Sequence, residues 1–117
     1  MMQIVGIVDP NEFRRNSIAE RFSIPEENKF TSVEDFVARD KFADAVINGT
    51  MDHIHVETSL PILKAGYDIL LEKPFAVNEA EMRELVSCAN EYNRKIMVCF
   101  VLRYGPFYRR IKETLLT

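Results

Sequence analysis

Four polar groups follow apolar stretches of the chain, and their residue types decide which chemistry is open to it. They are Asp9, residues 48–55, Glu72-Lys73-Pro74 and Arg103. A lysine at the end of a strand can hydrogen-bond a hydroxyl or carbonyl, and its charge stabilises developing negative charge. The competing interpretations are a solvated acid–base pair for Glu72 and Lys73 and an ordinary surface residue for Arg103.

Asp9 directly follows the apolar residues 4–8. In a dinucleotide-binding fold, an acid at this place accepts hydrogen bonds from the adenosine ribose hydroxyls. The same residue is a good helix N-cap, with Pro10 at the first helical position and Glu12 completing a capping box. Taken by itself, Asp9 fits the cap better than the ribose site.

His53 and His55 lie beside Asp52, which raises the question of a metal site. Two side chains at i and i+2 point to different faces of a helix, and the usual helical pair of ligands is H-x-x-x-H. We therefore expect no metal here and assign His55 to contact with a substrate or a ribose. Cys88 and Cys99 make neither a disulfide scaffold nor a metal motif, so we expect both in the core.

Apolar runs alternate with segments of helical periodicity, and these supply the elements that hold the polar groups. Strands are predicted at residues 4–8, 29–31, 43–48, 67–71 and 95–102. Helices are predicted at residues 11–22 and at 106–116. Three more are predicted between them: one after a cap at Ser32, one that runs through Pro61 to Ala65 and stops at Gly66, and one that begins at Asn78 with Glu81. The core-facing side chains are expected to be Phe13, Ile18, Ala19 and Phe22 on the first helix, Val33, Phe36 and Val37 on the second, and Met82, Leu85, Val86, Ala89 and Tyr92 on the fourth.

This alternation of strands and helices predicts a parallel α/β sheet covered on both faces. In such sheets ligands bind beyond the carboxyl ends of the strands, where all four polar groups are expected to lie.

The composition is that of a globular protein, with 47% hydrophobic and 28% charged residues over 117 positions, so we expect a single domain. Fifteen basic and 18 acidic residues leave a net charge of −3, which argues against a general nucleic-acid binder. No apolar run approaches the ~18 residues of a membrane span, and no signal peptide is visible. We expect a cytoplasmic protein with no membrane or nucleic-acid partner.

Three stretches together form a pattern specific enough to indicate a family. They are Thr50-Met51-Asp52-His53-Ile54-His55, Ala65-Gly66-Tyr67-Asp68-Ile69-Leu70-Leu71-Glu72-Lys73-Pro74-Phe75 and Phe100-Val101-Leu102-Arg103-Tyr104. Their order and spacing resemble the glucose-fructose oxidoreductase and inositol dehydrogenase family (Gfo/Idh/MocA) over nearly the whole chain. The pattern A-G-x-x-x-L-x-E-K-P is its most specific part.

The resemblance implies an NAD(P)-binding Rossmann domain, a doubly wound parallel sheet, that serves redox chemistry on sugars, polyols or related compounds. By this resemblance Asp9 binds the adenosine ribose and favours NAD, with NADP as the alternative cofactor. Thr50 and His55 lie next to the nicotinamide half of the cofactor, and Glu72 approaches the nicotinamide ribose. Arg103 lines the cofactor or substrate pocket.

The resemblance also assigns the catalytic role to Lys73. Its side chain is placed to contact the sugar-like substrate and to assist proton transfer. Pro74 belongs to the cofactor site, and the Lys73–Pro74 peptide bond is expected to be cis.

The chain departs from the family pattern within the loop and at both ends. Met51 and Asp52 replace the usual proline and asparagine, which puts an acid near the nicotinamide pocket. The four glycines are too far apart for G-x-G-x-x-G, and the eight residues before Asp9 leave no room for a first strand and phosphate loop. We therefore expect residues 1–117 to form a partial Rossmann domain that lacks its first strand, its glycine-rich loop and a C-terminal substrate domain.

Three further expectations follow from this incompleteness. The isolated chain is expected to bind NAD weakly or not at all and to be inactive, because no glycine-rich turn holds the pyrophosphate. The lost strand would lie between the strand that ends at Asp9 and the strand that ends at Asn48. Two strand edges without partners recruit another copy, so we expect a homo-oligomer, a dimer in the first instance.

Two functions of other classes compete with the oxidoreductase. One is a non-catalytic α/β association module from a truncated gene product. The other is a phosphoacceptor signalling domain, which Asp9, Thr50 and Lys73 fit superficially. That class needs an aspartate at the end of the central strand, where this chain has Asn48.

Overall fold

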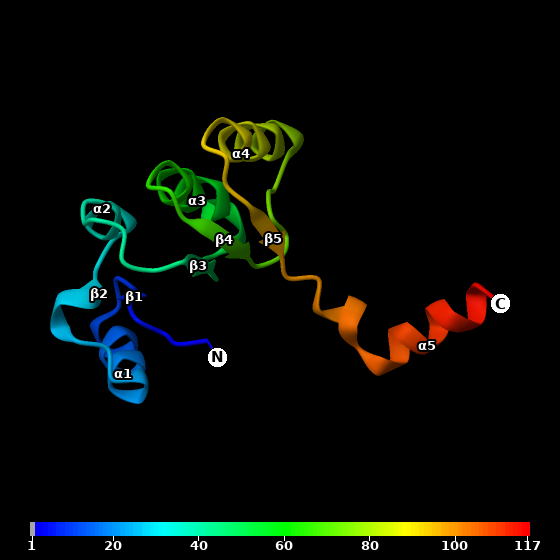
Figure 1. Ribbon diagram of the computed structural model, residues 1–117, viewed down its shortest axis with the longest axis horizontal. Coiled ribbons are helices and arrows are strands. Elements are labelled where there is room, and N and C mark those ends of the chain that lie inside the picture. The colour runs from blue at the N-terminus through cyan, green and yellow to red at the C-terminus, as the bar shows by residue number, and fades with distance from the viewer. Residues whose placement is uncertain (1) are drawn as a thin grey trace.

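The computed structural model describes residues 2–117, in which short strands alternate with helices (Figure 1). The strands are β1 (Ile7–Val8), β2 (Lys29–Phe30), β3 (Ala45–Asn48), β4 (Asp68–Leu71) and β5 (Ile96–Val98). The α-helices are α1 (Glu12–Phe22), α2 (Val33–Val37), α3 (His55–Lys64), α4 (Glu79–Glu91) and α5 (Pro106–Leu115). Short 3-10 turns lie at Glu26–Asn28, Asp52–Ile54 and Val101–Tyr104.

The strands form two parallel sheets. β1 pairs with β2 in one of them, and the other has the order β3-β4-β5. In the second sheet Ile47 lies opposite Leu70, and Leu70 lies opposite Met97. The prediction of an incomplete, Rossmann-like α/β fold is confirmed, because within residues 2–117 no pairing joins β1 to β3.

An aromatic cluster joins the two sheets in place of hydrogen bonds between them. The ring of Phe36 on α2 lies 5.5 Å from that of Phe30 on β2 and 5.0 Å from that of Tyr67, just before β4. The backbone N–H of Phe42 also donates to the Tyr67 hydroxyl at 3.3 Å. Phe30, Phe36 and Tyr67 are buried, so this cluster links β2 and α2 to the core of the larger sheet.

Helices α3 and α4 pack on one face of the three-stranded sheet (Figure 1). Leu63 of α3, Leu71 of β4 and Leu85 of α4 are fully buried there. The opposite face carries the Ile47–Leu70–Met97 row, of which Ile47 is 53% and Met97 56% exposed. The expectation of a sheet covered on both faces is therefore correct for only one face of this sheet.

Helix α1 begins two residues later than the predicted cap. Asn11 is the N-cap, since its side chain accepts the backbone N–H of Arg14 at 2.9 Å. Asp9 instead accepts the N–H of Asn11 at 2.8 Å, so its capping box with Glu12 was wrong. An N-cap needs its oxygen over the N2 or N3 amide, and Asn11 meets that condition here.

The caps of α2 and α4 were predicted correctly. The Ser32 hydroxyl accepts the N–H of Asp35 at 3.1 Å. The Asn78 side chain accepts the N–H of Glu81 at 2.9 Å. Gly66 has φ +88°, the left-handed conformation in which glycine commonly follows a helix end.

The predicted core faces of α1 and α4 are only partly correct. On α1 Ala19 is buried, but Phe13 is 82% and Phe22 44% exposed. On α4 the buried side chains are Leu85, Cys88 and Ala89, while Met82, Val86 and Tyr92 are exposed. Each helix contacts only one side of a narrow sheet, so the apolar stripe is wider than the surface it covers.

The last predicted strand was too long. β5 ends at Val98, and the chain turns at Phe100 into the 3-10 turn that carries Arg103. Apolar residues such as Val101 and Leu102 favour a strand by composition, but both are exposed here. Pro61 lies inside α3, six residues beyond its start, so it does not delay that start.

Within residues 2–117, no helix combines the length and the apolar character needed to cross a membrane.

Candidate functional site

The carboxyl ends of β3, β4 and β5 come together at one edge of the sheet. The ladder continues past the strands, with the N–H of Glu72 donating to the carbonyl of Asn48 at 3.0 Å. The N–H of Cys99 donates to the carbonyl of Leu71 at 2.9 Å. Residues 48–50, 72–74 and 99–100 therefore form one continuous edge, as the sequence predicted for this sheet.

Asn48 fixes the turn that leaves β3. Its side chain is buried, and its amide nitrogen donates to the hydroxyls of Thr58 and Ser59 on α3, both at 2.9 Å. Its amide oxygen accepts both the N–H and the hydroxyl of Thr50, at 3.1 and 2.8 Å. A buried amide with both ends bonded specifies one loop conformation, because a buried polar group without a partner is costly.

His55, the first residue of α3, is fully buried between two loops. Its Nδ1 lies 2.7 Å from the carbonyl oxygen of Pro74, and its Nε2 lies 2.8 Å from the carbonyl oxygen of Thr50. The predicted direct contact between His55 and a cofactor is not available in this arrangement, since both ring nitrogens face backbone. The ring ties the loop after β3 to the loop after β4.

The loops held in this way present three polar residues to the surface. Thr50 and Lys73 are exposed, and Glu72 is half-buried. The N–H of Lys73 donates to the carboxylate of Glu72 at 3.3 Å. The Lys73–Pro74 peptide bond is cis, as expected.

Glu72 also lies against β5. Burial raises the pKa of the Cys99 thiol, and the neighbouring carboxylate of Glu72 raises it further. Cys99 is half-buried rather than fully in the core, whereas Cys88 is buried as expected. A raised pKa disfavours the thiolate, which is the reactive form of cysteine.

The Asp9 end forms a separate part of the candidate site, after β1 of the smaller sheet. Its carboxylate binds Arg14 through two contacts, Oδ2 to Nε and Oδ1 to Nη2, each at 2.9 Å. The hydrogen bond from Arg14 lowers the pKa of Asp9, so the carboxylate is ionised at neutral pH. The Asp9 carbonyl accepts from Arg15 at 2.7 Å.

Arg103 does not join the strand ends. It lies in the 3-10 turn after β5, where it is exposed and its guanidinium carbon lies 5.5 Å from the centre of the Phe100 ring. Arg103 lines a groove together with residues of α5, among them Arg109 and Glu113, and not together with the strand ends that carry Thr50 and Lys73.

The residues present fit part of a dinucleotide. Asp9 supplies an ionised acceptor for ribose hydroxyls, and Thr50 supplies a hydroxyl near β3. A Cβ added at Gly49 would meet no atom within 4 Å, so the turn after β3 is open on that side. A pyrophosphate needs a cluster of backbone N–H groups from a glycine-rich turn, and no such turn occurs in the sequence.

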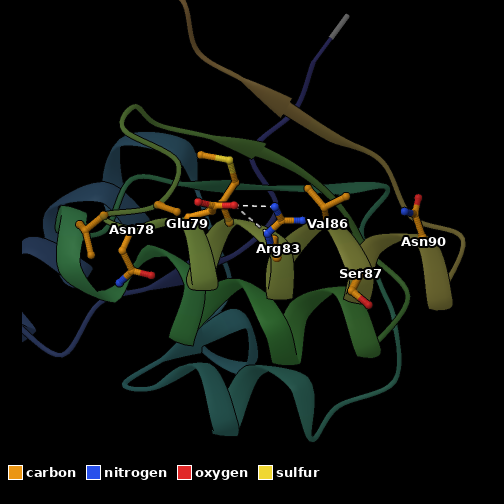
Figure 2. Close-up of a pocket in the computed structure, with 9 residues that line it drawn as sticks. Asn78, Glu79, Arg83, Val86, Ser87 and Asn90 are labelled. Atoms are coloured by element: carbon orange, nitrogen blue, oxygen red, sulfur yellow. Dashed lines mark hydrogen bonds and ion pairs between the residues drawn. The ribbon is translucent and has the colours of Figure 1, made fainter.

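One groove on the surface lies elsewhere. Figure 2 shows it along α4, lined by side chains that include Asn78, Glu79, Arg83 and Val86. Three of its polar side chains are engaged within the helix, since Asn78 caps α4 and Glu79 binds Arg83 Nε at 2.9 Å. None of the predicted site residues lines this groove, so we do not assign it to the cofactor.

No group of three or more histidine, cysteine, aspartate or glutamate side chains in residues 2–117 is arranged to hold a metal ion.

Comparison with known proteins decides the relationship of this chain. A family profile described as an oxidoreductase family with an NAD-binding Rossmann fold, GFO_IDH_MocA, matches residues 1–100. The chain belongs to the Gfo/Idh/MocA family. The resemblance inferred from the A-G-x-x-x-L-x-E-K-P pattern is confirmed.

Curated Gfo/Idh/MocA relatives align with almost the whole chain. The trans-1,2-dihydrobenzene-1,2-diol dehydrogenase of Xenopus laevis is 30% identical over 113 residues, which are 97% of this chain and 33% of that protein. The inositol 2-dehydrogenase of Corynebacterium glutamicum strain R is 30% identical over 111 residues, 94% of this chain and 32% of that protein. The chain therefore spans about a third of the length of these relatives.

A solved structure shares the fold. The myo-inositol 2-dehydrogenase of Lactobacillus plantarum superposes with a TM-score of 0.86 at 19% identity, covering 97% of this chain and 33% of that one. At this identity the likeness establishes the Rossmann fold and nothing finer.

The roles of two residues in this Gfo/Idh/MocA chain escaped the sequence analysis. Asn48 was placed among the polar residues that follow a strand, but its role in fixing the turn was not predicted, although its position before Gly49 and Thr50 is typical of such a side chain. Arg14 was not considered, although an arginine within one helical turn of a predicted strand-end acid is a signal for an ion pair.

Proposed function

We propose that this chain is part of the NAD(P)-binding domain of an oxidoreductase that acts on a polyol, a sugar or a similar hydroxylated compound. Its relatives are named for the oxidation of an inositol and of a 1,2-diol, substrates that share neighbouring hydroxyl groups. Solved neighbours in complex with NADH and with NADP support the cofactor class without favouring either form.

The observation that carries this proposal is the exposed Lys73 on a loop fixed from both sides. On one side the N–H of Glu72 continues the ladder to Asn48, and on the other side the Pro74 carbonyl accepts from His55. A flexible lysine gains catalytic value when its backbone is held, because a small displacement of a reacting group costs much of the rate.

In the proposed reaction Lys73 binds the hydroxyl group that is oxidised. Its Nζ takes the hydroxyl proton while the carbon–hydrogen bond breaks, and it returns this proton in the reverse direction. The nicotinamide, when bound, supplies the acceptor for the hydride.

The other site residues are assigned to the cofactor. Asp9 binds the adenosine ribose, and Glu72 approaches the ribose of the nicotinamide. Thr50 lies beside the nicotinamide, and His55 acts on it through the carbonyls of Thr50 and Pro74. Arg103 reaches the pocket only if the turn after β5 packs against a bound ligand or further polypeptide.

We also propose a homo-oligomer and a cytoplasmic location. β1 and β3 each have one edge without a strand partner in residues 2–117, and such edges favour association. Cys88 and Cys99 are both free thiols, which suits a reducing compartment.

The test is to read the DNA on both sides of the segment that encodes this chain and to express the complete reading frame. We expect a polyol or cyclic diol to reduce NAD or NADP. The absorbance of the reduced nicotinamide measures this reaction. The proposal is contradicted if the reading frame is three times this length and the protein that it encodes oxidises no such alcohol and binds neither cofactor.

The second candidate is a non-catalytic association module. The exposed apolar residues Ile47 and Met97 on the open sheet face and the unpaired strand edges favour it. A reading frame limited to these 117 residues, with no nucleotide binding but a defined oligomer, supports this module against the enzyme.

A further inference from the structure

Asn48 is followed directly by Gly49, and the sequence contains this dipeptide once. Asparagine is one of the thermolabile residues, because its side-chain amide can be lost without an enzyme. The backbone nitrogen of the next residue attacks the side-chain carbonyl carbon, a carbon–nitrogen bond closes a succinimide ring, and the amide nitrogen leaves as ammonia with the N–H proton. Water then opens the ring to aspartate or isoaspartate. Glycine allows this attack most readily, since no Cβ crowds its nitrogen.

The backbone around Gly49 does not require a glycine. A Cβ added there meets no described atom within 4 Å, and the one glycine of residues 2–117 with a positive φ is Gly66. Gly49 is exposed and immediately precedes the loop that carries Thr50. An alanine would therefore fit the same conformation with a less reactive dipeptide, so Gly49→Ala is a conservative test variant.

The side chain of Asn48 is held at both ends in the closed loop. Its Nδ2 donates to Thr58 Oγ1 and Ser59 Oγ, both at 2.9 Å, and its Oδ1 accepts from the Thr50 hydroxyl at 2.8 Å. Asn48 is 3% exposed. Attack by the Gly49 nitrogen requires Cγ to turn out of these contacts, and opening of the succinimide requires water. Both steps therefore depend on local opening of the loop.

The product does not fit the position that Asn48 occupies. An ionised carboxylate only accepts hydrogen bonds, whereas Nδ2 donates there. Nδ2 also lies 3.4 Å from the carbonyl oxygen of His55, and the Thr58 hydroxyl already donates to the carbonyl of Ile54 at 2.7 Å. A carboxylate oxygen in place of Nδ2 meets the lone pairs of these oxygens and loses its bonds, which is costly for a buried group.

We propose that Asn48-Gly49 is a site of spontaneous deamidation that the closed loop after β3 keeps inactive. Opening of this loop converts Asn48 irreversibly to aspartate or isoaspartate, and the modified loop no longer closes in its original conformation. Water is the only co-reactant. This inference goes beyond the proposed function and does not depend on it, because it needs only the folded chain.

The experiment follows deamidation of the 117-residue chain by mass spectrometry of its tryptic peptides, in native buffer and in guanidinium chloride. The peptide 42–64 contains Asn48 as its one asparagine, and the peptide 16–21 contains Asn16, which precedes Ser17. In denaturant we expect Asn48 to react faster than Asn16. In native buffer we expect Asn48 to react about 100-fold more slowly than in denaturant, which corresponds to a loop that is open about one per cent of the time.

Two variants remove the hydroxyls that hold Nδ2. We expect Thr58→Val and Ser59→Ala each to speed the reaction of Asn48 in native buffer about tenfold, the effect of one lost hydrogen bond on an opening equilibrium, and to leave the rate in denaturant unchanged. Thr114→Val is the matched control and is expected to have no effect. Its hydroxyl donates to the carbonyl four residues earlier at 2.9 Å, as that of Thr58 does, but on α5.

Each part of the inference can be overturned separately. Equal rates for Asn48 in native buffer and in denaturant overturn the protection by the fold. A rate in denaturant that Gly49→Ala does not lower overturns the dipeptide as the reactive site. If Thr58→Val and Ser59→Ala leave Asn48 unaffected, or speed Asn16 equally, the hydroxyls have no specific role. None of these results bears on nicotinamide binding, so the proposed function is tested independently.

Discussion

His55 Nδ1 lies 2.7 Å from the carbonyl oxygen of Pro74, 19 residues further along the chain. The other ring nitrogen lies 2.8 Å from the carbonyl oxygen of Thr50. Carbonyl oxygens only accept hydrogen bonds, so the ring must donate to each of them that it binds. One fully buried side chain thereby sets the spacing between the two loops that carry Thr50 and Lys73.

Replacing His55 separates its two contacts. Asn at this position keeps a donor near Nδ1 and so retains the bond to Pro74, whereas Gln keeps one near Nε2 and retains the bond to Thr50. His55→Ala loses both contacts and leaves a cavity, so we expect a loss of about 2–4 kcal/mol in the free energy of unfolding. Urea unfolding is the measurement, and we expect each amide variant to lose less than His55→Ala. Equal losses in all three would mean that packing alone matters.

Lys73→Ala is expected to lower turnover far more than cofactor affinity in the complete enzyme that we propose contains this chain. A positioned acid–base group contributes roughly 100- to 10,000-fold to the rate. Steady-state kinetics with a polyol, together with a cofactor titration, test this. Lys64→Ala, at the exposed end of α3, is the matched control. Unchanged turnover in Lys73→Ala would remove this lysine from the mechanism.

The isolated chain is expected to bind NAD with a Kd above about 1 mM. Asp9 holds only the ribose end, and no glycine-rich turn supplies backbone N–H groups to the pyrophosphate. Isothermal titration calorimetry with NAD tests this expectation. A micromolar Kd would show that these residues contain a phosphate site that the sequence does not reveal.

The Asp9–Arg14 pair is expected to stabilise the fold at neutral pH and not in acid. Its partner lowers the pKa of Asp9 in the folded state, so protons bind more tightly to the unfolded chain. The contribution is complete above the unfolded pKa, near pH 4, and is lost as the pH falls through the lower folded value. Urea unfolding of the wild type and Arg14→Gln between about pH 7 and pH 2 measures it. A stability difference that stays constant over this range would contradict the assignment.

The isolated chain is expected to form a dimer at micromolar concentration. β1 and β3 each have one edge without a strand partner in residues 2–117, and exchange between two copies would pair these edges without repacking α1. Light scattering after size exclusion gives the mass directly. A clean 13.6 kDa monomer would mean that the exposed edges are tolerated in solution.

The sequence was most informative where one signal had one physical cause. Gly66 and the caps Ser32 and Asn78 were predicted correctly because each depends on a local backbone hydrogen bond or conformation. The carboxyl ends of β3 and β4 were also located correctly, since both strands are short apolar runs followed by polar residues. Each of these signals depends only on a few neighbouring residues.

The predictions that were wrong depended on contacts between distant parts of the chain. Phe13 and Phe22 were assigned to a core because apolar periodicity states which side of a helix should be covered, not whether a partner is there. His55 was assigned to a ligand because its two carbonyl partners lie in other loops and leave no mark in the local sequence. The sequence of one chain does not reveal contacts between distant segments.

Helix α5 projects from the rest of the molecule (Figure 1), and none of its residues is buried. Phe107, Ile111 and Leu115 recur at every fourth position along one side, and they are 70%, 42% and 79% exposed. A ten-residue helix without tertiary packing is marginal in water, so its free energy of local opening is close to zero. Its amide protons should exchange with solvent orders of magnitude faster than those of β4. Slow amide exchange in α5 would therefore indicate that its apolar stripe is covered, and fast exchange would indicate that the stripe is exposed to solvent.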